Sequence, residues 1–125
     1  MKPIKILAVD DESNVRVFYQ RWGKSKGFDV VAVEKGTDAV ERIKEIEFDL
    51  VFLDVRMPDI DGLETMRRIK KVAPSLPVFI TTGSERDAIV EQAIREGAVG
   101  YIYKPFEMEE LMQAVDKIRK NSPDR

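Results

Sequence analysis

Side chains suited to acid, metal or phosphoryl chemistry recur at a few positions, and each follows or ends a short apolar run. They are the acid pair Asp10-Asp11, the acid Asp54, the hydroxyl of Thr82 and the ammonium of Lys104. Carboxylates that gather in one place repel one another unless a cation offsets their charge or one is held protonated. Mg²⁺ prefers hard oxygen ligands and typically takes one or two carboxylates. These residue types therefore predict a Mg²⁺ site if the fold brings them together.

Each of these residues also has an ordinary structural explanation. Asp10 and Asp11 could cap a helix, and Asp54 could open a loop. Thr82 could be a β-branched strand end, and Lys104 could lie in a solvated turn. Their joint occurrence at the ends of predicted strands favours a common site over separate structural roles.

The composition narrows the chemistry further. The chain has neither cysteine nor histidine, so thiolate and imidazole groups are excluded as nucleophile, base or metal ligand. Its 21 basic and 23 acidic residues give a net charge of -2, and we expect neither nucleic acid nor a membrane as a direct ligand. The apolar run near the N-terminus is too short for a signal peptide or a membrane span, and we expect a cytoplasmic location.

Short apolar runs alternate with amphipathic stretches along the whole chain. The runs are rich in β-branched residues, which predicts strands over residues 4–9, 28–33, 50–53, 78–82 and 99–103. Apolar residues at helical spacing predict helices around residues 15–22, 39–43, 63–69, 89–94 and 111–118. Helix-ending signals agree, with Gly27, Gly97 and Pro74 after three of these stretches and a capping pair at Asp61 and Glu64.

Five β/α units in 125 residues predict one α/β domain, a doubly wound five-stranded parallel sheet with helices on both faces. Periodicity does not give the strand order. In such sheets ligands bind outside the carboxyl ends of the strands, where the residues singled out above stand.

The motifs resemble the signature of response-regulator receiver domains of two-component phosphorelay signalling, in particular the single-domain chemotaxis type. The matching residues are Asp10-Asp11-Glu12, residues 54–59 with Asp61-Gly62, Thr82, and Lys104-Pro105-Phe106. The resemblance covers essentially the whole chain. It implies a flavodoxin-like (βα)5 fold with strand order 2-1-3-4-5, a receiver domain over residues 1–121 and a C-terminal tail over residues 122–125.

The resemblance also implies a set of roles for individual residues. Asp54 is the implied phosphoryl acceptor, and Mg²⁺, with Mn²⁺ as an alternative, would be bound by Asp10, Asp11, Asp54 and the backbone carbonyl of Arg56. Thr82 and Lys104 would act with Asp54 in catalysis.

Further implied roles concern switching and lifetime. Thr82 and Tyr101 would form the conformational switch, and Lys104 would precede Pro105 across a cis peptide bond. Side chains at Arg56 and Ser84, two residues after the acceptor and the hydroxyl respectively, would tune the lifetime of the phosphorylated state. We expect Arg56 to shield the acyl phosphate from water.

The function implied is that of a signalling switch, which catalyses only its own phosphorylation and dephosphorylation and is not an enzyme in the usual sense. The donor would be a phosphohistidine on a sensor kinase or phosphotransfer protein, with small acyl phosphates as substitutes. The surface that changes would be built from the fourth helix, fifth strand and fifth helix. The few residues after Lys120 are too short for an effector domain, so the output would pass through a partner or a segment outside this chain.

Other functions fit the sequence less well. A hydrolase of the haloacid dehalogenase type needs an acid two residues after its nucleophile, where this chain has Arg56. A pseudo-receiver that serves only as a scaffold has no need to retain all of the polar residues together. A calcium loop would place Met57 and Arg68 at ligand positions, and the basic residues of 67–71 are typical of a solvated helix face.

Overall fold

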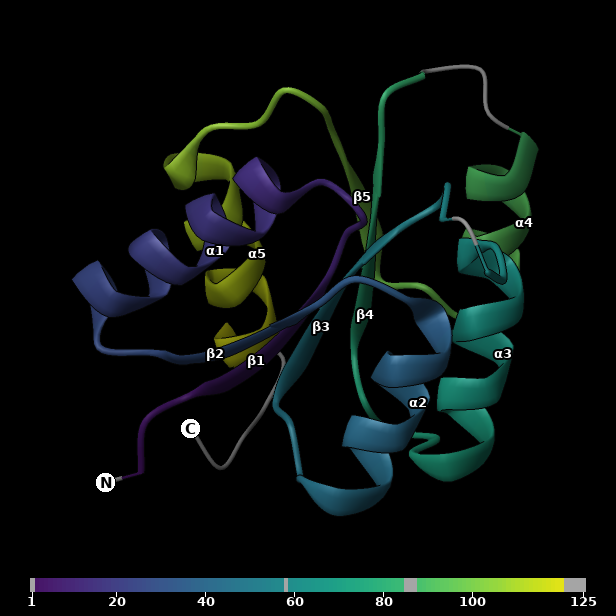
Figure 1. Cartoon of the computed structure of the whole chain (residues 1–125), viewed down its shortest axis with the longest axis horizontal. Coiled ribbons are helices and arrows are strands. Elements are labelled where there is room, and N and C mark those ends of the chain that lie inside the picture. The colour runs from purple at the N-terminus through teal and green to yellow at the C-terminus, as the bar shows by residue number, and fades with distance from the viewer. Residues whose placement is uncertain (1, 58, 85–87, 121–125) are drawn as a thin grey trace.

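The computed structural model describes residues 2–57, 59–84 and 88–120, so Pro58 of the sequence motif and the expected tail at 122–125 lie outside the described residues. Strands and helices alternate along the chain (Figure 1). In chain order the elements are β1 Lys5–Val9, α1 Ser13–Lys26, β2 Asp29–Val33, α2 Gly36–Glu45, β3 Leu50–Asp54, α3 Gly62–Val72, β4 Val78–Thr82, α4 Ala88–Arg95, β5 Gly100–Tyr103 and α5 Met108–Lys120.

The strands form one parallel sheet in the order β2-β1-β3-β4-β5, which confirms the expected doubly wound fold and strand order. Three predicted strands, β1, β2 and β5, begin one residue later than expected, and β3 continues to include Asp54. The register aligns the strand ends, because Val9 lies opposite Leu53 and Asp54 lies opposite Thr81. The residues after these strands therefore emerge at the same edge of the sheet.

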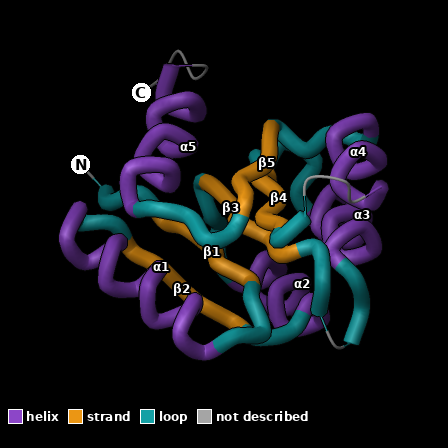
Figure 2. The backbone as a smooth tube through the Cα atoms, turned by 90° about the horizontal axis from the view of Figure 1, so that it is seen from above, coloured by secondary structure: helices purple, strands orange, loops and turns teal. Residues whose placement is uncertain are grey.

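Helices cover both faces of the sheet (Figures 1 and 2): α1 and α5 lie on one side, and α2, α3 and α4 on the other. Alternate residues of each strand face opposite sides, which gives the protein two apolar layers. On β1, Ile6 and Ala8 pack with α1 and α5, whereas Leu7 and Val9 pack with the other three helices. The inner strands β1, β3 and β4 are buried on both faces, which explains why they are apolar almost throughout.

The predicted helix ends are largely confirmed. Gly27 follows α1 in the left-handed conformation with φ 75°, and Gly97 follows α4 with φ 118°. Asp61 caps α3 by accepting a hydrogen bond from the Glu64 amide at 2.9 Å. The side chain of Glu64 instead pairs with Arg68 at 2.9 Å, one turn further along the same helix.

None of the helices in the described part of the chain combines the length and the apolar character that crossing a membrane requires.

Candidate functional site

The candidate site lies at the carboxyl edge of the sheet, where backbone hydrogen bonds continue past the strands. The amide of Asp10 donates to the Val33 carbonyl at 3.1 Å, and the amide of Lys104 donates to the Thr82 carbonyl at 2.7 Å. Both residues are thereby fixed one position beyond β1 and β5. Asp54 ends the central strand β3 between them, so three polar side chains from separate segments converge.

Lys104 joins the two buried acids of the site. Its ammonium lies 2.7 Å from Asp10 Oδ2 and 3.1 Å from Asp54 Oδ2, and Glu12 Oε1 is 3.8 Å away. The side chain of Asp10 is completely buried and that of Asp54 is nearly so. The peptide bond between Lys104 and Pro105 is cis, as the resemblance implies. A half-buried cation thus lies between two buried carboxylates, and three of the strand-end residues meet at one edge of the sheet.

Burial and mutual repulsion set the protonation of Asp54. Desolvation raises the pKa of Asp54 to about 6, and the nearby charge of Asp10 adds to the increase, while Lys104 and the Arg56 amide oppose it. Burial also works against the charged form of Lys104. Its bonds to Asp10 and Asp54 outweigh burial and hold the pKa of the ammonium above its usual value. The site thus carries more negative charge than Lys104 alone offsets.

Three consecutive acids lead from the interior of the site to its mouth. One carboxylate oxygen from each of Asp10, Asp11 and Glu12 lies within 4.8 Å of the other two, and Asp11 and Glu12 are exposed. Glu12 was not predicted as a ligand, although its position directly after the acid pair is a usable sequence signal. The alternative role of Asp10 and Asp11 as helix caps is not observed, since Glu12 occupies the N-cap of α1 and no side chain caps it there. Asp10 Oδ1 instead accepts from the Glu12 amide at 2.9 Å.

The hydroxyl of Thr82 faces its own loop. It accepts from the Ser84 amide at 3.1 Å and donates to the Ser84 carbonyl at 3.2 Å. Thr82 is nearly completely buried at the end of β4, one residue beyond the partner of Asp54. The structure therefore places Thr82 at the site edge, with its hydroxyl engaged by the segment that leads towards α4.

The remaining predicted residues lie at the periphery. The Arg56 amide is 3.5 Å from Asp54 Oδ1, and the residue as a whole is exposed. Tyr101 lies apart from the acids on the edge strand β5, where 49% of the residue is exposed. Its ring contacts that of Tyr103, with 5.2 Å between the centroids. Arg56 adjoins the site through its backbone, whereas Tyr101 belongs to the outer surface.

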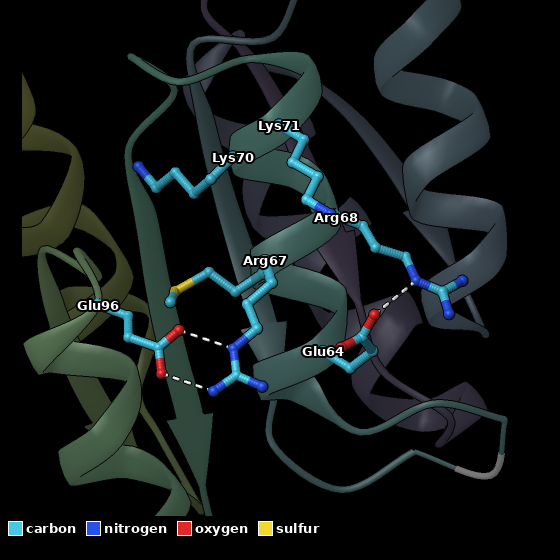
Figure 3. Close-up of a pocket in the computed structure, with 7 residues that line it drawn as sticks. Glu64, Arg67, Arg68, Lys70, Lys71 and Glu96 are labelled. Carbon is cyan, nitrogen blue, oxygen red and sulfur yellow. Dashed lines mark hydrogen bonds and ion pairs between the residues drawn. The ribbon is translucent and has the colours of Figure 1, made fainter.

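A groove between α3 and α4 is lined mainly by charged side chains, and none of its lining residues belongs to the candidate site (Figure 3). Arg67 of α3 faces Glu96 and makes two hydrogen bonds to its carboxylate, each 2.7 Å long. Lys70 donates to the Leu76 carbonyl at 2.7 Å. The basic run was expected to be a solvated helix face, and this is correct only in part, because these two side chains bind neighbouring segments.

A family model and the most similar curated proteins point to the same protein family. The family model described as the response regulator receiver domain matches residues 6–116. The chain is 36% identical over 118 residues to the chemotaxis protein CheY of Listeria monocytogenes, with 94% of this chain and 99% of that protein covered. It is 34% identical to the transcriptional regulatory protein ZraR of Escherichia coli over 91% of this chain, which spans only 26% of ZraR.

The fold has close counterparts among solved structures. The Vibrio cholerae chemotaxis protein CheY4 superposes with a TM-score of 0.86 at 25% identity, covering 94% of this chain and 99% of that one. A family match over residues 6–116, together with 36% identity along almost the full length of a CheY, shows that the chain belongs to the response-regulator receiver domains of two-component signalling.

Proposed function

We propose that this receiver domain is a phosphoacceptor switch, in which Asp54 takes a phosphoryl group from a phosphohistidine on a sensor kinase or phosphotransfer protein. The observation that carries the proposal is the ammonium of Lys104, which lies 2.7 Å from Asp10 and 3.1 Å from Asp54. A cation held at this point can neutralise the oxygens of a phosphoryl group arriving on Asp54. The receiver domain would extend over residues 1–121, with the tail beyond it.

The donor set fits Mg²⁺. Every available ligand is a hard oxygen. Burial, and after it the nearby charge of Asp10, raises the pKa of Asp54 despite Lys104, so a further cation would favour the charged carboxylate. Asp10, Asp11, Asp54 and the Arg56 carbonyl would hold the ion, with Glu12 as an additional carboxylate at the mouth. When bound, the ion supplies positive charge to the acids and to the transferring phosphoryl group. Mn²⁺ suits the same ligands.

The transfer can be written as a balanced exchange of bonds. A carboxylate oxygen of Asp54 attacks the phosphorus atom in line, the phosphorus–nitrogen bond of the donor breaks, and the imidazole leaves with the electron pair. The product is an acyl phosphate on Asp54. Water later attacks the same phosphorus atom, which restores the carboxylate and releases inorganic phosphate. The chain thus catalyses its own modification and its reversal, and acts on no separate substrate.

The change would spread through Thr82 to the outer surface. The Thr82 hydroxyl would leave Ser84 and bind the phosphoryl group, which would draw the end of β4 towards the site. Tyr101 would respond on the neighbouring strand, where Ile80 of β4 pairs with it. The surface of α4, β5 and α5 would then bind a downstream effector protein, or an effector domain outside this chain, in the cytoplasm.

The geometry favours a switch over a hydrolase of the haloacid dehalogenase type. Such a hydrolase places an acid two residues after the nucleophile, and the side chain here is the exposed guanidinium of Arg56. A scaffold that is never phosphorylated would not need the buried acids Asp10 and Asp54 beside Lys104, whose burial costs free energy.

The decisive experiment is intact-mass analysis after incubation with a small acyl phosphate. We expect one added phosphoryl mass in the presence of Mg²⁺, and none when EDTA is added. Asp54→Asn should abolish the modification, whereas Asp116→Asn, an exposed acid on α5, should not. Modification that survives in Asp54→Asn, or that is alkali-stable on a serine or threonine, would overturn the proposal.

A further inference from the structure

Helix α2 begins without a cap from its own sequence. The N-cap residue, Lys35, has extended backbone angles and makes no side-chain hydrogen bond to the helix. The first amides of a helix have no partner within the helix and usually bind a side chain just before it. Here the partner is Asp59, which comes from the loop between β3 and α3.

Both carboxylate oxygens of Asp59 take part in this remote cap. Oδ1 accepts from the Gly36 amide at 3.2 Å, and Oδ2 accepts from the Thr37 amide at 3.0 Å. The Thr37 hydroxyl donates to the same Oδ2 at 2.9 Å. Burial at the helix start works against the charged form of Asp59, but the hydrogen bonds that it accepts together outweigh burial. The amides of Thr37 and Ile60 hold the pKa of this carboxyl well below its usual value, and it is ionised at neutral pH.

The loop that carries Asp59 is also the loop that leaves the phosphoacceptor. It begins directly after Asp54, contains Arg56, and ends at Asp61, which caps α3. Two acids of one loop therefore bind the N-termini of two different helices. The far end of the loop is fixed to α2 by Asp59 and to α3 by Asp61.

Two glycines show how closely these parts pack. A Cβ atom on Gly36 would overlap the Thr65 hydroxyl and lie 2.8 Å from Cγ1 of Ile60. A Cβ atom on Gly62 would lie 2.6 Å from the Asp54 carbonyl oxygen. The start of α2 thus presses on the first turn of α3, and the start of α3 presses on the backbone of the acceptor. Close-packed contacts of this kind transmit small displacements.

We propose that Asp59 is a positioning residue for the phosphoacceptor site: by capping α2 from the loop, it fixes the Arg56 carbonyl and the backbone of Asp54. The inference rests on the proposed function, in which that carbonyl is a Mg²⁺ ligand. Asp59 itself is not one of the proposed ligands. Residues that hold a metal ligand in position without binding the metal typically change metal affinity by 10–100-fold when they are removed.

The test compares variants of the full chain by calorimetric titration with Mg²⁺. Asp59→Ala removes the cap and should weaken Mg²⁺ binding by about tenfold. Asp59→Asn removes the charge but keeps one acceptor oxygen, so it should recover much of the affinity. Thr37→Ala leaves the loop sequence and every charge intact, and should weaken binding by a smaller factor. Asp38→Ala, an exposed acid in the first turn of α2, is the matched control for lost charge and should bind like wild type.

Amide chemical shifts without any metal give a readout that is independent of the proposed function. Asp59→Ala should move the amide signals of Asp54 and Arg56, and Asp38→Ala should not. Should Asp59→Ala fail to fold by circular dichroism, Thr37→Ala and Asp59→Asn provide the same comparison.

Wild-type affinity and unmoved Asp54 and Arg56 signals in the folded Asp59 and Thr37 variants would overturn the inference. Equal losses in Asp59→Asn, Asp59→Ala and Asp38→Ala would also overturn it, because they would indicate a charge effect alone. If the proposed function itself were wrong, the result would be different: the wild-type chain would not be modified on Asp54 by acyl phosphate.

Discussion

Two clusters of opposite charge in this molecule have similar components and different surroundings. At the strand ends, Lys104 joins Asp10 and Asp54, and the exposed fractions of the three side chains are 18%, 0% and 6%. Between α3 and α4, Arg67 joins Glu96 with exposed fractions of 47% and 26%. The two acids respond in opposite ways: burial raises the pKa of Asp54 to about 6, whereas hydrogen bonds from Arg67 and Gln92 lower the pKa of Glu96 to about 2.

This difference shows that the electrostatic effect of an ion pair depends on how far its groups are removed from water. In the buried cluster, removal from water dominates, so the site is under electrostatic stress that a cation or a phosphoryl group can change. In the groove, water screens the charges, and the bidentate geometry mainly orients two helices. The predictions below test this contrast, beginning with the largest expected effect.

Lys104→Met should be the most damaging change. Asp10 and Asp54 would lose their shared cation, and breaking a buried pair in this way costs about 3 kcal/mol of unfolding free energy. We expect that loss of stability when unfolding is measured in EDTA at neutral pH. With Mg²⁺ present, we expect an approximately hundredfold slower modification by acyl phosphate, because a charge that stabilises the transition state is gone. Mg²⁺ affinity should rise, since the ammonium no longer repels the ion. Urea titration followed by circular dichroism measures the first effect, and a variant as stable as wild type would contradict the assignment.

Asp54→Asn should stabilise the metal-free protein in a pH-dependent manner. The folded pKa of Asp54 is about 6 and its ordinary value is 3.8, so folding disfavours the charged form. The wild-type protein therefore has its full stability below pH 3.8, where Asp54 is neutral in both the folded and the unfolded chain. It loses stability as the pH rises through 6 and folded Asp54 must become charged. The neutral amide does not titrate. We therefore expect Asn to be more stable than Asp by about 3 kcal/mol at alkaline pH, with little difference in acid. A gap that does not depend on pH would argue against the raised pKa.

Arg56→Ala should shorten the lifetime of the phosphorylated protein. In the proposed function, Lys104 and a bound ion would neutralise the phosphoryl oxygens, which would leave a third cation little charge to stabilise. The bulk of Arg56 would instead cover the approach of water. We expect about threefold faster phosphate release, equivalent to about 0.6 kcal/mol in the barrier. Release should be compared at two salt concentrations, because salt weakens a charge effect and leaves a steric one unchanged. Unchanged or slower release would refute shielding.

Arg67→Met and Glu96→Gln should have the smallest effects. Arg67 is exposed and Glu96 is partly exposed, so the loss of stability should be slight and should disappear at about 0.5 M salt. Arg67→Met is also the matched control for Lys104→Met, since each change replaces a paired cation by the same apolar side chain. A large effect on modification in Arg67→Met would mean that the groove and the strand ends are coupled.

Much of the fold and of the site was predictable from the sequence, because both depend on local patterns. The β-branched runs define the strands, and a parallel sheet brings Asp10, Asp54 and Lys104 to one edge. The remote contacts carry no such pattern. Asp59 is adjacent in sequence to nothing that it caps, and Arg67 belongs to a basic run whose composition suggests only solvation. Their partners depend on how α2 and α4 pack, which follows from tertiary structure alone.

The aromatic cluster under α1 has a practical consequence for optical work on this protein. Trp22 is the only tryptophan in the chain, and it is completely buried. Its ring meets Phe28 edge-on at 5.4 Å and Phe52 at 6.0 Å between centroids. Indole emission should therefore be blue-shifted in the native state and move to longer wavelength when α1 detaches from the sheet. Intrinsic fluorescence thus offers a label-free signal of whether the α1 layer remains in place.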